Sequence, residues 1–149
     1  MKDTVKYRVS FHVSHPSLTG AQILKAIGLL PKYVQSIGEN RVTWGGKPLE
    51  GVYTQTNISF KASNGVVCNE EVELSDFIRK TMDSLPLEFI NELVESGGEN
   101  FFLVGIFTEG NVLYYFDADL LFDMSKHGIG LKLDFYGGPE QSNAQPEGI

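Results

Sequence analysis

Cysteine is almost absent from this sequence, and its scarcity narrows the class of protein. Cys68 is the single cysteine among 149 residues. One thiol cannot form an intramolecular disulfide framework, a CxxC redox pair or a cysteine-based zinc site. A chain of this length buries about 68–70% of the surface that its unfolded form exposes, so its core needs no covalent or metal staple. We therefore expect a domain held by ordinary packing in a reducing compartment.

Long hydrophobic runs are missing as well. Nowhere do about 18 apolar residues follow one another, as a membrane-spanning helix requires. Met1 to Thr4 lead directly into an alternating segment, without the apolar stretch of a secretory leader. These features predict a cytoplasmic protein with no membrane partner.

Basic residues are outnumbered by acidic ones. The 12 Lys and Arg face 19 Asp and Glu, which gives a formal net charge of -7. This balance is unfavourable for a protein whose affinity comes from neutralising phosphates, so a nucleic-acid partner is not expected. An acidic surface instead speeds the encounter with a basic protein partner.

The start of the chain carries a clear strand pattern and a clear helix pattern. Residues 5–13 alternate strictly between apolar and polar, which predicts a half-buried strand. Thr19 and Gln22 have the spacing of a capping box, and Gly28 stands where a helix ends. A short helix over about 20–27 is predicted.

Residues 29–53 are rich in proline and glycine and show no sustained period. They are interpreted as a long, partly ordered loop, a kind of segment that is either functional or mobile in compact domains. The loop holds Trp44, the single tryptophan. Burial of Trp44 as a lid on the core is favoured because large aromatic side chains gain most by burial, and an exposed anchor for a ligand or protein is the alternative.

The second half of the chain contains further turn, cap and strand signals. Asn64-Gly65 predicts a tight hairpin, Ser75 and Asp117 are predicted helix N-caps, and Leu85-Pro86 predicts a break between two helices. The predicted strands are 54–62 paired with 66–72, then 101–107, 112–116 and 131–135.

The resulting order of elements predicts an α+β fold with a mainly antiparallel sheet and helices on one face. Its first six elements match the ferredoxin-like βαββαβ order, and a βαβ-like piece is appended. A single domain is expected over residues 1–136. The tail over 137–149 has almost no apolar content and is expected to be disordered.

Catalytic motifs are missing: the sequence holds no GxGxxG, Walker A, GxSxG, HExxH or EF-hand pattern. We therefore predict a protein that is not an enzyme and that has no cofactor and no metal. His12 and His15 are three residues apart on a strand and so face opposite sides. A hydrolase using Asp117, Asp119 or Asp123 is the least favoured alternative, since acidic residues are ordinary at a helix start.

Five residues form the candidate partner or ligand surface: Arg41, Trp44 and Lys47 in the 38–52 loop, and Glu70 and Glu71 in an acidic run before a helix. The preferred hypothesis is an interaction module that binds a basic protein through this loop and the acidic surface. The alternative is a small-molecule pocket beneath the 38–52 loop, with Trp44 and Arg41 at its mouth. The sequence leaves the oligomeric state open.

Several of these features occur together in one known family. They are the alternating first strand, the segment from Ile23 to Leu29 followed by Pro31, the Gly46-Lys47-Pro48-Leu49 loop, the apolar helix with Pro86, and the final run from Leu131 to Tyr136. Over roughly residues 5–136 the chain resembles the bacterial family called domain of unknown function 4279. The resemblance implies a small α+β domain of a bacterial cytoplasm, and small acidic domains of this kind can act as immunity- or antitoxin-like partners.

Overall fold

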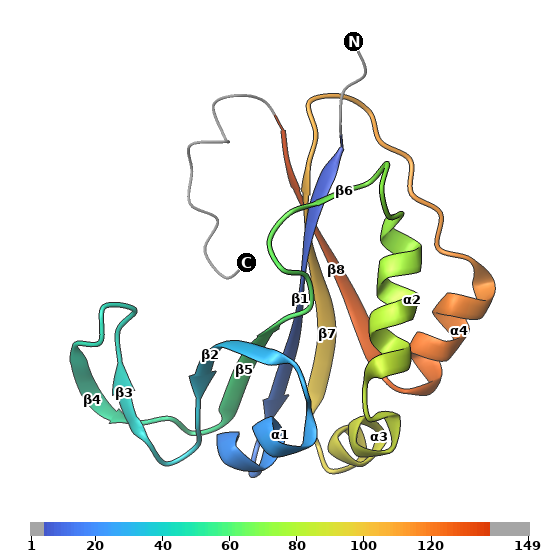
Figure 1. The fold of residues 1–149 in the computed structure, drawn as a ribbon. Helices are drawn as coiled ribbons and strands as arrows, with labels where there is room; N and C mark the ends of the chain where they lie inside the picture. The colour runs from blue at the N-terminus through green and yellow to red at the C-terminus, as the bar shows by residue number, and fades with distance from the viewer. Residues whose placement is uncertain (1–4, 138–149) are drawn as a thin grey trace.

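The computed structural model describes residues 5–137, which form an α+β fold with a mainly antiparallel, mixed sheet (Figure 1). The helices are α1 (Gly20–Ala26), α2 (Leu74–Ser84), α3 (Leu87–Glu95) and α4 (Ala118–Lys126). The strands are β1 (Lys6–His15), β2 (Leu30–Gln35), β3 (Asn40–Val42), β4 (Pro48–Val52), β5 (Thr56–Lys61), β6 (Val67–Cys68), β7 (Glu99–Phe107) and β8 (Ile129–Tyr136). The α+β class predicted from the sequence is confirmed.

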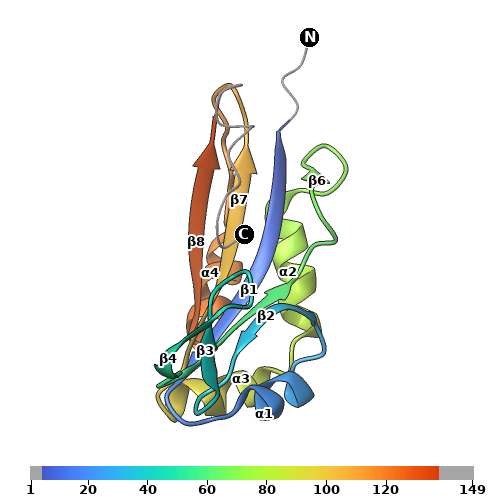
Figure 2. The ribbon, with the colours of Figure 1, turned by 90° about the vertical axis from the view of Figure 1, so that its left-hand side faces the viewer.

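The main sheet has the strand order β2-β5-β1-β7-β8. Neighbouring strands are antiparallel except β7 and β8, which run parallel and are joined through α4. In Figure 2, α2 and α4 lie behind the sheet and α1 and α3 lie at its lower end, and we call the face turned toward the viewer the open face. The edge strands of this path are β2 and β8.

The core lies between the sheet and the helices and begins with the alternation of β1. Tyr7, Val9, Phe11 and Val13 are at most 2% exposed and face the helices. Phe11 packs against Phe102 of β7 with ring centroids 5.1 Å apart. Because successive side chains of a strand point to opposite faces, the intervening polar residues of β1 lie on the open face.

The predicted start of α1 and the predicted break between α2 and α3 are both present, whereas the predicted N-cap of α2 is wrong. The capping box of α1 is present, since Thr19 Oγ1 accepts from Gln22 N while Gln22 Oε1 accepts from Thr19 N. Two separate helices flank Leu85 and Pro86, as predicted. The N-cap of α2 is Glu73 rather than Ser75, because the backbone turns into the helix two residues earlier, where Asn69 Oδ1 accepts from Leu74 N.

The interpretation of residues 29–53 as a loop is wrong. The segment holds β2, which pairs with β5, and a separate two-stranded hairpin made of β3 and β4. The register of β2 shifts between Pro31 and Tyr33, which breaks its alternation. Every residue of β3 and β4 is exposed, so neither strand carries an apolar periodicity that the sequence could reveal.

The predicted hairpin of 54–62 with 66–72 is also wrong. The turn is present, with Gly65 at a φ of 82°, but β6 pairs with β1 and not with β5. The reason is length: β1 extends beyond the last residue of β5, and β6 fills the free edge that remains beside Lys6 and Tyr7.

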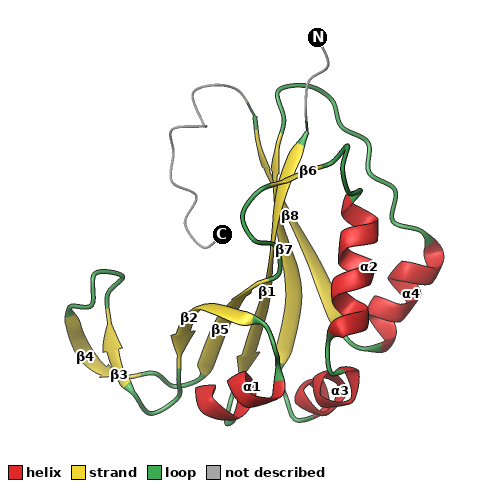
Figure 3. Cartoon of the chain, viewed as in Figure 1, coloured by secondary structure: helices red, strands yellow, loops and turns green. Residues whose placement is uncertain are grey.

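Residues 112–116 do not form the predicted strand. They run as an unpaired connection to α4, drawn as a loop in Figure 3. Their alternation is real, because Val112, Tyr114 and Phe116 pack on the core while Leu113 and Tyr115 are exposed. It reflects an extended chain lying over the core, and the neighbour of β7 is instead β8.

Two further expectations concern membranes and the tail. Among residues 5–137, no helix combines the length and the apolar character that crossing a membrane requires. The tail expected to be disordered lies outside the described residues from position 138 onward.

Candidate functional site

A hollow lies between the edge strand β2 and the β3–β4 hairpin. We call β3, β4 and their connecting turn the hairpin arm, and the hollow the arm cleft. Its volume is about 590 Å³, and it is lined by Tyr33, Val34 and Gln35 of β2 and by Val42, Thr43, Trp44, Gly46 and Tyr53 of the arm and its base. In Figure 2 the arm lies in front of the lower part of the sheet, on its open side. A cleft of this size falls in the range of ligand pockets.

A compact turn closes the tip of the arm. Thr43 N donates to Lys47 O at 2.8 Å, and Gly46 N donates to Thr43 O at 2.9 Å. Gly46 has a φ of 82°, a conformation that glycine adopts without steric cost. At the base, Gly38 N donates to Tyr53 O and Tyr53 N donates to Glu39 O. These bonds hold the arm as a defined strand pair despite its exposure.

Aromatic side chains dominate the arm cleft. Trp44 is 74% exposed, so the prediction that it covers the core is wrong. Its ring instead meets Tyr33 of β2 edge to face, with centroids 5.7 Å apart. The Tyr53 hydroxyl donates to Val42 O and accepts from Val42 N, which holds that ring against β3. The cleft therefore has aromatic walls in which the Tyr53 ring is held by hydrogen bonds and the indole of Trp44 is largely exposed to solvent.

The structure separates the five predicted surface residues into two groups. Arg41, Trp44 and Lys47 are exposed on the arm, but Arg41 lines a second, smaller hollow and not the arm cleft. Glu70 and Glu71 are exposed in the connection between β6 and α2, which Figure 1 places on the opposite side of the molecule from the arm. The sequence analysis does not identify Tyr33 and Tyr53 as site residues. Strand patterns over 30–35 and 48–52 could have pointed to them, but the bulge breaks the alternation of β2 and every residue of β4 is exposed.

The open face of the sheet carries a second group of polar residues. His12 of β1 lies beside Ser59 of β5 on one side and Phe101 of β7 on the other. His12 Nε2 is 3.0 Å from Ser10 Oγ and 3.3 Å from Ser59 Oγ, and its ring stacks on Phe101 with centroids 4.9 Å apart. Burial lowers the pKa of His12 to about 4, with the ammonium groups of Lys132 and Lys32 acting in the same direction. The imidazole is neutral at pH 7.

A serine close to a neutral histidine has the geometry of a nucleophile and its base. Here Ser10 is 4% exposed and Ser59 is fully buried, so neither hydroxyl can reach a substrate. The two serines instead hold the imidazole in place on the sheet.

His15 faces the core, opposite to His12 as predicted. Its Nδ1 accepts from the backbone N–H groups of Ser17 and Leu18, and its Nε2 therefore donates to Ser96 Oγ at 2.8 Å. The two histidines cannot share a metal ion. Within residues 5–137 no cluster of three or more His, Cys, Asp or Glu side chains has the spacing of a metal site.

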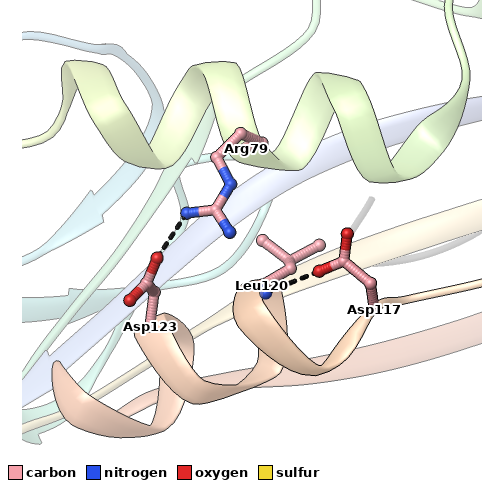
Figure 4. A network of polar contacts seen from close by, with 4 residues as sticks. All are labelled: Arg79, Asp117, Leu120 and Asp123. Atoms are coloured by element: carbon pink, nitrogen blue, oxygen red, sulfur yellow. Dashed lines mark hydrogen bonds and ion pairs between the residues drawn. The ribbon is translucent and has the colours of Figure 1, made fainter.

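The three aspartates of the hydrolase alternative have different surroundings, and Figure 4 shows those of Asp117 and Asp123. Asp117 is the N-cap of α4, where Oδ1 accepts from Leu120 N at 2.8 Å. Asp123 forms an ion pair with Arg79 of α2 at 2.6 Å. Asp119 is exposed in the first turn. Structural partners thus account for two of the three carboxylates.

Asp117→Ala is expected to destabilise the protein by about 1 kcal/mol, because the N–H of Leu120 loses its capping acceptor. Urea unfolding at pH 7 measures the change. Asp119→Ala is the matched control, since it removes a carboxylate from the same turn without removing a cap, and it should cost about 0.5 kcal/mol or less. Equal losses for the two variants would contradict the capping role.

Comparison of the chain with models of known protein families, with curated proteins and with solved structures finds no match. The case for function therefore rests on the arm cleft and the open face.

Proposed function

We propose that this protein is a non-enzymatic interaction module that binds an extended segment of a partner protein along β2, beneath the hairpin arm. The observation that carries the proposal is the position of the arm cleft. Three consecutive residues of an edge strand form one wall, and an exposed aromatic arm forms the other.

The edge of β2 supports this mode of binding. One side of β2 pairs with β5, and among the described residues no strand pairs with the other side. An unpaired edge is a template for an added strand, and peptide-binding domains use it through main-chain hydrogen bonds. Proteins whose edges are not used usually cover or charge them. On β2 such protection is confined to Pro31, Lys32 and the register shift before Tyr33. The residues that follow, Tyr33 to Gln35, carry no charge and line the arm cleft.

The arm supplies side-chain contacts for such a segment. Trp44, with 74% of its surface exposed, is the kind of residue that anchors an interface when a partner buries it. Tyr33 and Tyr53 extend the same surface into the cleft. Backbone pairing along β2 would give affinity, and the aromatic surfaces would select the side chains of the partner.

The acidic residues lie on a different part of the molecule from the arm cleft. Acidic residues concentrate on the helical side and before α2, including the exposed Glu70 and Glu71. We propose that they accelerate the encounter with a basic partner, an effect that salt screens. Because these residues lie far from the arm, their charge reversal should slow association and leave dissociation nearly unchanged.

A selected peptide tests the proposed mode. Peptides are selected from a display library against the full chain, and their affinities are measured by calorimetry. Trp44→Ala should weaken a bound peptide by about 10- to 100-fold. Tyr115→Ala is the matched control, because Tyr115 is also 74% exposed but lies outside the arm, and it should leave affinity unchanged. Methylating alternate backbone nitrogens of the peptide should abolish binding, since strand addition needs those donors.

Two results would contradict strand addition at β2. One is a set of binders indifferent to Trp44→Ala and to backbone methylation. The other is an absence of peptide binders together with a shift of Trp44 fluorescence by a small metabolite, which would favour the alternative of a small-molecule pocket beneath the arm. The volume of the cleft, about 590 Å³, is large enough for a small molecule and so supports that alternative.

The finer assignments of fold and family are also proposals. We propose that β1, α1, β2, β5, the α2–α3 pair and β7 form a ferredoxin-like βαββαβ unit to which α4 and β8 are appended. The antiparallel order β2-β5-β1-β7 supports it, and the hairpin arm and β6 are insertions in it. Membership in the family called domain of unknown function 4279 is proposed on the sequence features alone.

A further inference from the structure

Basic side chains converge on the open face of the sheet, although the chain as a whole is acidic. One row across four strands reads Lys61 of β5, Ser10 of β1, Leu103 of β7 and Lys132 of β8. Arg8 lies two residues before Ser10 and shares its face. These residues come from separate parts of the sequence, and only the sheet register brings them together.

A fourth cation joins this group from the edge. Lys32 lies in the bulge of β2 between Pro31 and Tyr33. Leu30 and Tyr33 pair with Lys61 and Ser59 of β5, so Lys32 lies beside the end of β5 that carries Lys61. Burial, and then the charges of Arg8 and Lys61, lower the pKa of Lys32. Lys32 and Lys132 together act on His12, which lies between them on β1. We call Arg8, Lys32, Lys61 and Lys132 the basic face.

In the described part of the chain, none of the four cations of the basic face forms an ion pair within 4.0 Å. Between residues 5 and 137 the ion pair within 4.0 Å is that of Arg79 with Asp123, on the helical side. Asp134 of β8 shares the row of Arg8 across Gly105 of β7 and accepts a hydrogen bond from the Tyr136 hydroxyl, so one carboxylate stands beside the four cations. The Nε of Arg8 is buried without a hydrogen-bond partner. An excess of like charges in one place costs stability, and such a local conflict is expected where a ligand supplies the missing negative charge.

The centre of the basic face can donate hydrogen bonds without adding charge. Ser10 and Ser59 both lie against His12 Nε2. If that nitrogen accepts from a serine hydroxyl, Nδ1 carries the proton of the neutral ring and is a donor. Lys132 Nζ is held 4.0 Å above the Phe101 ring on which His12 stacks. The basic face therefore has an ordered centre with cations around it.

We propose that the open face binds a small molecule carrying a phosphate-class oxyanion, held by Arg8, Lys32, Lys61 and Lys132 around His12. Clustered Lys and Arg with neutral donors suit such an anion, because charge-assisted hydrogen bonds are the strongest polar contacts available. A small ligand is favoured over a nucleic acid, since a net charge of -7 repels an extended polyanion beyond the few contacts of this face. None of the four cations lines the arm cleft, and the two sites share only strand β2, through Lys32.

Thermal unfolding and calorimetry with inorganic phosphate, phenyl phosphate and a single-stranded oligonucleotide test the proposal. Phosphate and phenyl phosphate should raise the Tm above that in sodium chloride of equal ionic strength. Lys32→Gln and Lys132→Gln should each weaken the binding by about 10- to 100-fold. Lys80→Gln and Lys126→Gln, exposed on helices, are the matched controls and should leave it unchanged.

Stability without ligand provides a second readout. Lys32→Gln removes a charge that Arg8 and Lys61 repel, so without phosphate its Tm should equal or exceed that of the parent. Three results would overturn the proposal: equal stabilisation by phosphate and chloride, equal losses for the Lys80 and Lys32 variants, or binding of the oligonucleotide alone. Lys132 is in β8, at the opposite edge of the sheet from β2, so the Lys132 variant distinguishes failure here from failure of the peptide site.

Discussion

Thr56→Val is expected to destabilise the protein by about 2–4 kcal/mol, a large loss for a change of one hydroxyl to a methyl. Thr56 is fully buried at the start of β5. Its Oγ1 donates to Leu18 O at 2.6 Å and accepts from Ile37 N at 3.0 Å. Valine keeps the shape but leaves the part-buried carbonyl of Leu18 and the part-buried N–H of Ile37 without this partner, and each costs about 1–2 kcal/mol.

The same hydroxyl has a functional consequence because of where its partners lie. Ile37 follows β2 and leads into the hairpin arm, while Leu18 precedes α1. Thr56 therefore ties the base of the arm to the body of the fold. We expect Thr56→Val to weaken a peptide bound in the arm cleft as well as to lower stability.

Urea unfolding and calorimetry on the same variant measure both effects. Thr54→Val makes the same chemical change at an exposed position two residues earlier, and its stability should stay within about 0.5 kcal/mol of the parent. Similar stabilities of the Thr56 and Thr54 variants would show that the buried hydroxyl does not hold the arm.

Acidification is expected to destabilise the protein through His12 between pH 6.5 and pH 4. The pKa of His12 is lowered from 6.5 to about 4 in the folded protein, first by burial and then by Lys132 and Lys32. Between these values the unfolded chain binds a proton that the folded chain does not, so stability falls as pH falls. Because the ring is partly exposed, we discount the full linkage and expect this group to contribute about 1–2 kcal/mol.

The contribution of His12 is isolated by difference. Unfolding free energies of the parent and of His12→Gln are measured at pH 7 and pH 4 in chloride buffers. The parent should lose about 1–2 kcal/mol more than the variant across this range. The variant retains His15, whose pKa burial also lowers, so that contribution cancels. An equal loss in both proteins would mean that His12 is not held neutral by its surroundings.

Local signals in the sequence predicted the parts of the fold that depend on near neighbours. The alternation of β1, the capping box of Thr19 and Gln22, the cap at Asp117 and the helix break at Pro86 all appear as expected. Each involves residues within a few positions, so its physics is contained in a short window. The α+β class follows from these elements.

Segments whose structure depends on distant partners were predicted wrongly. β6 is assigned to β5 by sequence proximity, yet it pairs with β1, whose free edge it completes. Residues 112–116 alternate because they lie over the core, and an alternating pattern does not distinguish that from a paired strand. The hairpin arm, exposed on both faces, offers no periodicity at all.

The candidate sites divide along the same line. Composition and charge are properties of the chain, and they make Arg41, Trp44 and Lys47 candidate surface residues, although burial of Trp44 as a lid is the favoured expectation and is wrong. Only the tertiary structure shows that Tyr33 contacts Trp44. It also shows that the connection between β6 and α2, which holds Glu70 and Glu71, lies on the opposite side of the molecule from the arm (Figure 1). It alone gathered Arg8, Lys32, Lys61 and Lys132 around His12, because strand register across the sheet relates residues far apart in sequence. Short stretches of sequence determine caps, turns and the alternation of a strand, whereas the binding surfaces depend on which distant strands pair.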